Sequence, residues 1–463
     1  MQEQFLIIYS QISGYLDEKI SRQRKNEKRI HMKKIILILT LVSFFRVFFA
    51  THTELTEDEA YYWVWAQNPD LSYFDHPPLI AYSILISTKI FGNNELGVRF
   101  PAILYSFLAG ILIFLISGKE IHSVLLALSF LILDVGGVIT TPDTPLVLFS
   151  LLFFFLMQNE KFLLAGIALG LALLSKYQAV LLLPLYIFYL RKNLKNLQFY
   201  LSPLIALFIF IPVILWNFEH QFISFKFQLH HGYAGSFNLT HPLKYILDTI
   251  LVLTPPLSLI VAYFTMKKTI RLNNKLLLFM VWFPWIFFFI SSFKGRPEAN
   301  WPCISYAFLP ALISRDYKKF NNKLRDFLLI LSYLLIFLIH LHAIKPFIPL
   351  KKDPVKRLHG WRSFAEEVKY YADSLEFDLI TTNTYQLASE LQFYLPGHPY
   401  VHALNIGRRE NQYTLWNHRV KPLRQFLYVG NINKLFLKEF NTITLIGNAH
   451  KGKKIIPLYL LFK

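Results

Sequence analysis

Long apolar runs alternate with short polar segments through residues 33–343, and this pattern predicts a polytopic membrane protein. A helix needs about 20 apolar residues to cross a bilayer, with a range of roughly 17 to 25. The first run is expected to be a retained membrane anchor, because a polar stretch at 51–54 follows it instead of a small-residue cleavage site. The segment 162–190 fits either two spans or one kinked span. The predicted spans are 33–50, 100–118, 122–140, 144–158, 162–175, 177–190, 199–216, 244–264, 276–293, 302–314 and 324–343.

Residues 344–463 follow a different pattern, in which His, Asn and charged residues are common and no segment is apolar enough to span. Short β-like runs surround a helical stretch at 385–394, as in a small α/β domain. The predicted fold is therefore mainly α, with about 11 transmembrane helices in 1–343 and an α/β domain in 344–463. The expected strands are 377–382, 400–404, 425–429, 442–446 and 455–462.

The charge distribution predicts the orientation of the chain in the membrane. The net charge is +19, but 54% of the residues are hydrophobic, only 17% are charged and the mean hydropathy is +0.38, so a nucleic-acid partner is not expected. Lys and Arg crowd residues 19–34, whereas 51–78 has neither. By the positive-inside rule the N-terminus is cytoplasmic and this first loop, 51–99, faces outward. The later basic loops stay inside only if 79–91 lies on the outer face without crossing and 162–190 makes two passes. This leaves the C-terminal domain outside, in the periplasm.

The first outward loop carries the acidic cluster Glu57, Asp58 and Glu59. Thr56 followed three residues later by Glu59 is a capping box, and acids in a first helical turn suit the helix dipole. Capping explains Asp58 less well than its neighbours, so a catalytic carboxylate is the alternative. The aromatic residues that follow, Tyr62 among them, fit an interfacial belt.

Asp75 and His76 precede two prolines in the same loop. They could solvate a turn, bind an acceptor hydroxyl or hold a divalent metal. No third ligand stands nearby in the sequence, so a metal cofactor stays open and no metal ligand is assigned. The single cysteine, Cys303, excludes an intramolecular disulfide framework and a Cys-rich zinc site.

Asp143 and Lys176 place further charges near the same face. Asp143, between two prolines, is either a helix cap or a second outward carboxylate. Lys176 interrupts a largely apolar stretch, and an intramembrane charge is a functional candidate by default, with snorkelling to the interface as the alternative.

Two later outward loops add polar candidates, for which ordinary solvated residues are the alternative. Loop 217–243 supplies Lys226, His230 and His231, and loop 294–301 supplies Glu298 and Asn300. Acids with a few cations suit the transfer of a group from a lipid phosphate. A carboxylate would deprotonate an acceptor hydroxyl, and cations would stabilise charge on the departing phosphate.

The motifs resemble those of the type C glycosyltransferases of the dolichyl-phosphate-mannose protein mannosyltransferase group, family 39, especially the bacterial relatives similar to aminoarabinose lipid A transferases. They lie in family order over most of the chain, and together they are specific for the family but not for a substrate. The matching segments are 57–63, 75–78, 91–92, 97–101, 141–145, 166–176, 216–217, 298–302 and 408–416.

The resemblance implies an inverting transfer from a sugar on a polyprenyl phosphate, at the periplasmic face of a bacterial inner membrane. The acceptor would be a lipid similar to lipid A, another glycan or a protein, and the enzyme is expected to act as a monomer among membrane lipids. Asp58 would be the general base or the main acceptor-binding carboxylate, and Lys176 would lie near the donor phosphate. The family's further basic phosphate contact cannot be chosen among Lys226, His230 and His231. Some relatives bind a divalent metal and others do not.

These arguments define the predicted site. The expected catalytic residues are Asp58, Glu59 and Asp143. The expected substrate-binding residues are Lys176, Tyr62, Asp75, His76, Lys226, His230, Glu298 and Asn300. The rival hypotheses are a transporter or an assembly factor for lipid-linked sugars. A transporter would place ionisable residues near the bilayer midplane, where Asp134 and Asp248 are the candidates.

Overall fold

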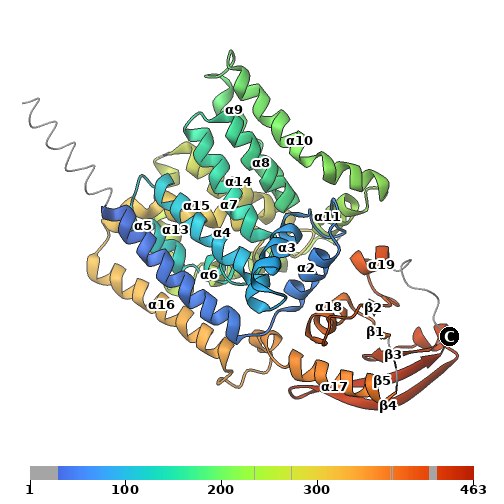
Figure 1. Ribbon diagram of the computed structural model, residues 1–463. Helices are drawn as coiled ribbons and strands as arrows, with labels where there is room; N and C mark the ends of the chain where they lie inside the picture. The colour runs from blue at the N-terminus through green and yellow to red at the C-terminus, as the bar shows by residue number, and fades with distance from the viewer. Residues whose placement is uncertain are drawn as a thin grey trace, which may run out of the picture.

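A computed structural model describes residues 30–233, 235–272, 274–375, 377, 379–416 and 425–462. The basic N-terminal segment that led to the cytoplasmic prediction lies largely outside these residues. Helices make up most of the described chain, and a small α/β unit from its last quarter packs against one end of the helical part (Figure 1). The protein is thus a mainly α membrane protein with a small C-terminal sheet.

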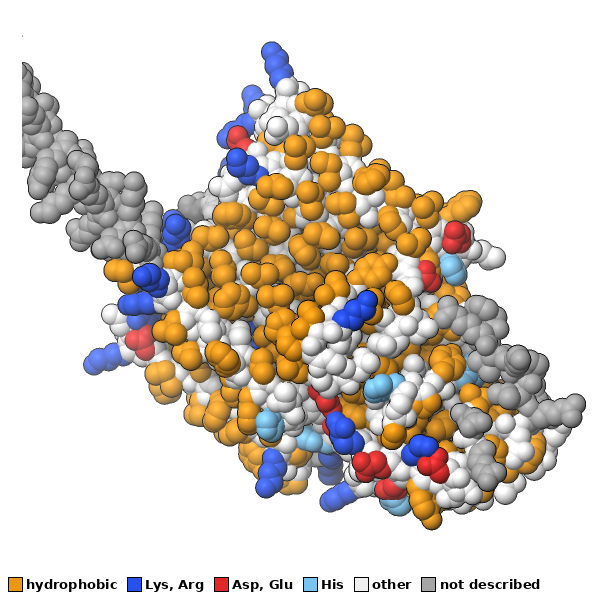
Figure 2. Space-filling view, in the orientation of Figure 1, with side chains coloured by type: hydrophobic (Ala, Val, Ile, Leu, Met, Phe, Trp, Pro, Cys, Tyr) orange, Lys and Arg blue, Asp and Glu red, His pale blue; other side chains and the backbone are white. Residues whose placement is uncertain are grey.

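Among the described residues, four helices are long and apolar enough to cross a membrane: Ile30–His52, α4 (Glu95–Ile116), α10 (Leu197–Glu219) and α16 (Asn322–Ile344). Hydrophobic side chains cover a broad surface of the helical part, with Lys and Arg at its edges (Figure 2). The shorter apolar helices are α3 (Leu79–Phe91), α7 (Asp143–Gln158), α8 (Phe162–Ser175), η1 with α9 (Tyr177–Leu190) and α14 (Lys275–Ser291). Two further helices in this part are α11 (Ile223–Tyr233) and α15 (Cys303–Lys318).

Two of the predicted spans are each divided into two α-helices. Residues 122–140 form α5 (Ile121–Ser129) and α6 (Leu131–Val135), and residues 244–264 form α12 (Thr240–Val252) and α13 (Pro255–Ile270), which are bent by 108°. Pro255 explains the second break, because proline lacks an N–H and disfavours a helical conformation in the residue before it.

A side chain at the second break satisfies backbone groups at the first. Thr254, at the bend between α12 and α13, accepts a hydrogen bond at Oγ1 from the Leu131 amide at 3.0 Å. The same hydroxyl donates to the Ser129 carbonyl at 2.7 Å. Polar backbone groups freed inside a membrane need such partners, so the sequence pattern identified the apolar stretches but not their continuity.

The C-terminal unit is an α/β domain built on a five-stranded sheet with the order β2-β1-β3-β5-β4. Strands β2, β1 and β3 are parallel, and β5 and β4 are antiparallel. Each predicted strand is present, although β1 is shorter and β4 longer than expected, and the predicted helix is α18 (Tyr385–Tyr394). The strands are β1 (Ile380–Thr382), β2 (Val401–Ala403), β3 (Gln425–Val429), β4 (Thr442–Lys451) and β5 (Lys454–Phe462); the remaining helices are η2 (Pro354–Leu358), α17 (Trp361–Ser374), α19 (Gln412–Trp416) and α20 (Phe436–Glu439).

The C-terminal unit packs on α2 (Glu57–Gln67), the helix of the first loop. The two share one hydrophobic cluster, in which Trp63 of α2 meets Phe393 of α18 edge to face. The Glu54 carboxylate accepts from the amides of Trp361 and Arg362, at 2.6 and 3.1 Å, and so caps the first turn of α17. These contacts hold the acidic loop and the C-terminal unit together around a cavity.

Candidate active site

A polar cavity of about 470 Å³ lies where the first loop, the start of α7, the end of α8 and the C-terminal unit meet. It contains most of the residues predicted from sequence. Its lining residues are Asp58, Tyr61, Tyr62, Asp75, His76, Thr141, Pro142, Asp143, Lys176, Gln178, Phe227, Gln228, Glu298, Asn300, Trp301, Arg357, Tyr385 and Arg409.

Asp58 is presented to the cavity by the first turn of α2. The capping box predicted from sequence is present, with Thr56 as the N-cap. Arg357, from η2, donates through Nη2 to Asp58 Oδ2 at 3.2 Å and through Nε to Glu57 Oε2 at 2.5 Å. Burial among protein atoms raises the pKa of the Asp58 carboxyl, and Arg357 offsets part of that increase. A carboxylate with a raised pKa is a stronger base than an ordinary aspartate.

Glu59 does not reach the cavity, which corrects its predicted catalytic role. Its side chain is fully buried, and Arg99 donates to both of its oxygens at 2.9 Å. The amides of Thr56 and Thr140 donate to the same carboxylate at 2.9 and 3.1 Å. The Thr56 hydroxyl donates to it as well, at 3.2 Å. Five donors therefore occupy the Glu59 carboxylate, which joins α2, α4 and the loop before α7.

Asp143 and Lys176 form a buried ion pair at the wall of the cavity. Lys176 Nζ lies 2.8 Å from Asp143 Oδ1, and Asn300 Nδ2 donates to Asp143 Oδ2 at 2.6 Å. Lys176 is only 6% exposed, so it does not snorkel to a surface. Asp143 is the first residue of α7, and the N-cap position belongs to Pro142 with no side-chain cap. The structural alternatives considered from the sequence were helix capping by Asp143 and snorkelling by Lys176. Neither of them explains this ion pair.

The helix break after α8 is what positions Lys176. Its backbone is extended, with φ −159° and ψ 141°, between α8 and η1. A continuous helix through this point would carry the side chain along a helical face. The extended residue instead turns it toward α7.

Asp75 is held in the cavity wall by residues of α2, α11 and the C-terminal unit. Its carboxylate accepts from Tyr61 Oη at 2.9 Å and from Arg409 Nη1 at 3.0 Å, while its carbonyl accepts from Gln228 Nε2 at 2.6 Å. Burial raises the pKa of the Asp75 carboxyl and Arg409 counters the increase. Both carboxylate oxygens thus have donors within the protein.

Among the residues that the structure describes, no three His, Cys, Asp or Glu side chains are grouped so as to hold a metal ion. Asp75 and His76, considered as ligands from sequence, both line the cavity. The oxygens of Asp75 are occupied by donors instead. The described residues therefore offer no specific ligand set for the divalent metal that the sequence left open.

Lys226 and His230 do not line the cavity, although both were predicted to bind substrate. They are exposed on α11, whereas Phe227 and Gln228 of the same helix face the cavity. The side chain of His231 lies outside the described residues. The sequence placed the right helix at the site but not its face, because the helix has almost no difference in polarity between its sides.

Three lining residues come from the C-terminal unit and were not predicted: Arg357, Tyr385 and Arg409. Arg409 lies within the 408–416 segment, and the resemblance of that segment to a family motif could have identified it as a candidate site residue. Its guanidinium lies 4.9 Å from the ring centroid of Phe227 and 5.2 Å from that of Tyr385. Arg357 had no comparable signal, because only folding brings η2 beside α2.

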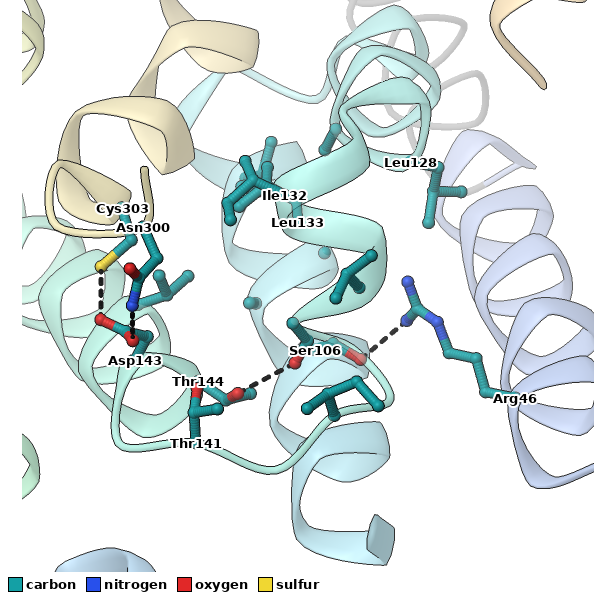
Figure 3. A pocket seen from close by; sticks show the side chains of 18 of the residues that line it. Arg46, Ser106, Leu128, Ile132, Leu133, Thr141, Asp143, Thr144, Asn300 and Cys303 are labelled. Atoms are coloured by element: carbon teal, nitrogen blue, oxygen red, sulfur yellow. Dashed lines mark hydrogen bonds between the residues drawn. The ribbon is translucent and has the colours of Figure 1, made fainter. Parts of the chain in front are cut away.

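A second pocket, of about 210 Å³ and mostly apolar, adjoins the cavity (Figure 3). Thr141, Asp143 and Asn300 line both spaces. In Figure 3 Asp143 and Asn300 stand at one end and Arg46 at the other, with leucine and isoleucine side chains between them. The Asp143 wall therefore separates a polar space from an apolar one.

The two acids weighed as evidence for a transporter both have cationic partners. Asp134 pairs with Arg46 at 3.2 Å and lies 3.4 Å from His340. Asp248 lies 3.6 Å from Arg296. These ion pairs give each acid a structural role, so neither acid requires a transport pathway to explain its position.

Comparison with known proteins gives matches in sequence and in fold. Residues 75–216 match the family described as dolichyl-phosphate-mannose-protein mannosyltransferase. The chain is 24% identical over 371 residues to the lipid A galacturonosyltransferase RgtD of Rhizobium johnstonii, covering 74% of this chain and 78% of that protein. It is 27% identical over 298 residues to an uncharacterized protein of Aquifex aeolicus, covering 61% of this chain and 70% of that protein.

Two crystal structures of ArnT from Cupriavidus metallidurans share the fold. The apo structure superposes with a TM-score of 0.66 at 12% identity, covering 93% of this chain and 98% of ArnT. The structure bound to undecaprenyl phosphate gives a TM-score of 0.62 at 13% identity, covering 93% and 97% of the two chains. The shared fold therefore includes the C-terminal unit as well as the helical part.

These findings make the chain a membrane enzyme of the glycosyltransferase class. It resembles the type C glycosyltransferases of the dolichyl-phosphate-mannose-protein mannosyltransferase group, whose family model matches residues 75–216, and it has the ArnT fold. The resemblance drawn from the sequence motifs is confirmed.

Proposed function

We propose that this enzyme transfers a sugar from a polyprenyl-phosphate-linked donor to an acceptor hydroxyl in the polar cavity. The observation that carries the proposal is the meeting of the polar cavity and the apolar pocket at Asp143, beside Lys176. A lipid-linked sugar needs both environments at once, an apolar space for its chain and a charged one for its phosphate. The bound undecaprenyl phosphate of the ArnT structure supports the same class of donor.

In the proposed reaction Asp58 takes the proton of the acceptor hydroxyl. The acceptor oxygen then forms a bond to the anomeric carbon of the sugar, and the bond from that carbon to the phosphate oxygen breaks. The phosphate leaves with the electron pair, and Lys176 stabilises its charge. Attack on the face opposite the phosphate inverts the anomeric configuration.

Asp143 and Asn300 would position Lys176 in this scheme. Asp143 holds the ammonium group at 2.8 Å, and Asn300 holds the other oxygen of Asp143. Tyr62, Asp75, His76 and Glu298 line the remaining polar wall and are proposed to contact the sugar or the acceptor. Lys226 and His230 are not included, because their side chains point away from the cavity.

We place the reaction at the periplasmic face of a bacterial inner membrane, with the N-terminus in the cytoplasm. The absence of Lys and Arg from 51–78 supports an outward first loop, and the C-terminal unit packs against that loop. We propose that residues 1–343 form a transmembrane domain with about 11 spans and that residues 344–463 form a periplasmic domain. The acceptor is proposed to be a lipid similar to lipid A, in line with the named relative; a glycan or protein is the alternative.

The experiment that tests the function is mass spectrometry of envelope lipids and glycans from cells with and without the protein. The expected result is a hexose, pentose or uronic-acid increment that is present only with the active enzyme. Purified protein in proteoliposomes with undecaprenyl-phosphate-linked sugars should reproduce the transfer. Unchanged envelope glycans together with no transfer in vitro would overturn the proposal.

A further inference from the structure

A second groove lies on the far side of η2 from the polar cavity, where the chain leaves α16. It encloses about 850 Å³ between residues 346–360 and the turn that joins β4 to β5. Two consecutive residues of η2 line different spaces: Lys356 lines the groove and Arg357 lines the polar cavity. The groove itself shares no lining residue with the cavity.

The groove is strongly basic. Five lysines line it, Lys351, Lys356, Lys451, Lys453 and Lys454, and Asp353 is the one acid among its lining residues. That acid already has partners within the protein, because its side chain is 2% exposed, accepts from the Val355 amide at 3.1 Å and lies 3.2 Å from His342 Nε2. Lys356 and Lys451 donate to backbone carbonyls of the protein. Lys351, Lys453 and Lys454 are exposed and can reach a ligand outside the protein.

The lip of the groove is apolar and exposed. Phe347, Ile348 and Leu350 follow α16 directly and are 57%, 45% and 45% exposed, and Ile455 of the β4–β5 hairpin is 60% exposed. Pro346 and Pro349 remove two backbone N–H groups from the same segment. Four bulky apolar side chains around lysines are unusual at a surface that meets only water.

The position of α16 places this lip at the edge of the bilayer. The helix has 23 residues, and a helix of that length rises about 34 Å, slightly more than the hydrocarbon core of a bilayer. The residues just beyond Ile344 therefore fall at the level of the lipid headgroups. Apolar side chains there can enter the acyl boundary while lysines reach the headgroup phosphates.

We propose that this groove binds the headgroup of an anionic phospholipid from the leaflet at the C-terminal end of α16. The phosphate lies against Lys453 and Lys454, and the acyl chains lie against Phe347 and Ile348. A lipid bound there attaches the β4–β5 hairpin to the membrane. The bound lipid also stabilises the position of η2, which carries Arg357. The proposal goes beyond sugar transfer and does not depend on it.

Native mass spectrometry of the purified full-length protein tests the proposal with added phosphatidylglycerol or phosphatidylcholine. The wild type should retain phosphatidylglycerol in preference to phosphatidylcholine. The double variant K453E/K454E should retain phosphatidylglycerol about tenfold less, because two phosphate contacts are reversed in charge.

The matched control is K434E/K438E, which changes the charge equally at two exposed lysines around α20 of the same unit. It should retain phosphatidylglycerol like the wild type. Equal retention of the two lipids by the wild type would overturn the proposal. So would an equal loss of binding in both double variants, since that would reflect net charge rather than this groove.

Discussion

Arg357 Nη2 lies 3.2 Å from Asp58 Oδ2, which joins a cation of the C-terminal unit to the proposed base on the first loop. The residues are 299 positions apart in the sequence. The arginine also contacts Glu57, so one side chain holds two of the three acids in the first turn of α2. The C-terminal unit is thus part of the proposed catalytic site and not only a cover for it.

Replacing Arg357 by Gln should shift the acid limb of the pH–rate profile to higher pH. Asp58 acts as a base only when ionised, so kcat/KM falls as the pH drops through its pKa. Burial raises the pKa of the carboxyl and Arg357 lowers it, so loss of the arginine raises it further. The measurement is kcat/KM against pH. Arg362→Gln is the control, because Arg362 pairs with Glu95 and does not line the cavity; an unmoved limb in R357Q would contradict the assignment of Asp58.

Asp58→Asn should reduce transfer by about 10²–10⁴-fold, the usual contribution of a general base. The amide keeps the size of the side chain but cannot take a proton, so membrane abundance should stay normal. Initial rates in proteoliposomes measure the effect. Asp70→Asn is the matched control, since Asp70 lies in the same loop but outside the cavity. Near-wild-type transfer by D58N would eliminate it as the base.

Lys176→Met should lower both donor affinity and protein abundance. The variant leaves Asp143 buried without its cation, which costs about 3–5 kcal/mol for a buried pair. The double variant K176M/D143N removes both charges and should recover abundance. Its KM for the donor should stay high, because the phosphate contact is still missing. Recovery of donor affinity along with abundance would assign Lys176 a purely structural role.

Glu59→Gln should lower stability, with activity per folded molecule largely kept. Its carboxylate and Arg99 are both fully buried, and removing one partner of such a pair costs about 3–5 kcal/mol. Thermal unfolding in detergent, with activity normalised to folded protein, separates the two effects. A stable but inactive variant would restore Glu59 to the catalytic group.

Glu390→Gln should stabilise the contact between α18 and α2 at neutral pH. Burial raises the pKa of the Glu390 carboxyl well above its usual 4.5, and neither oxygen has a hydrogen-bond partner within the described structure. The folded state binds this proton more tightly than the unfolded state, so stability is highest below about pH 4.5 and declines as the pH rises toward the folded pKa. The variant should lack this decline in melting temperature between acidic and neutral pH. An identical pH dependence in both proteins would show that Glu390 titrates normally.

The hydrophobic pattern predicted the helical class and the C-terminal strands because both signals are local. Strand β3 coincides with its predicted range, and β5 differs by one residue at its start. The breaks in the helical part were not predictable in the same way. Thr254 and Leu131 satisfy each other across the bundle, and no local signal connects them. Amphipathic α17 was not predicted, although Trp361, Phe364 and Val368 recur with a helical period.

The sequence alone determined which residues carry unusual chemistry near the membrane, since Asp58, Asp143 and Lys176 stand out against an apolar background. Tertiary structure alone decided which of them share a space. It buries Glu59 in an ion pair with Arg99. It also leaves Lys226 and His230 outside the cavity and places Arg357 and Arg409 in the cavity lining. The reason is physical: composition sets the cost of burying a charge, whereas the partner that offsets that cost is chosen by folding across hundreds of residues.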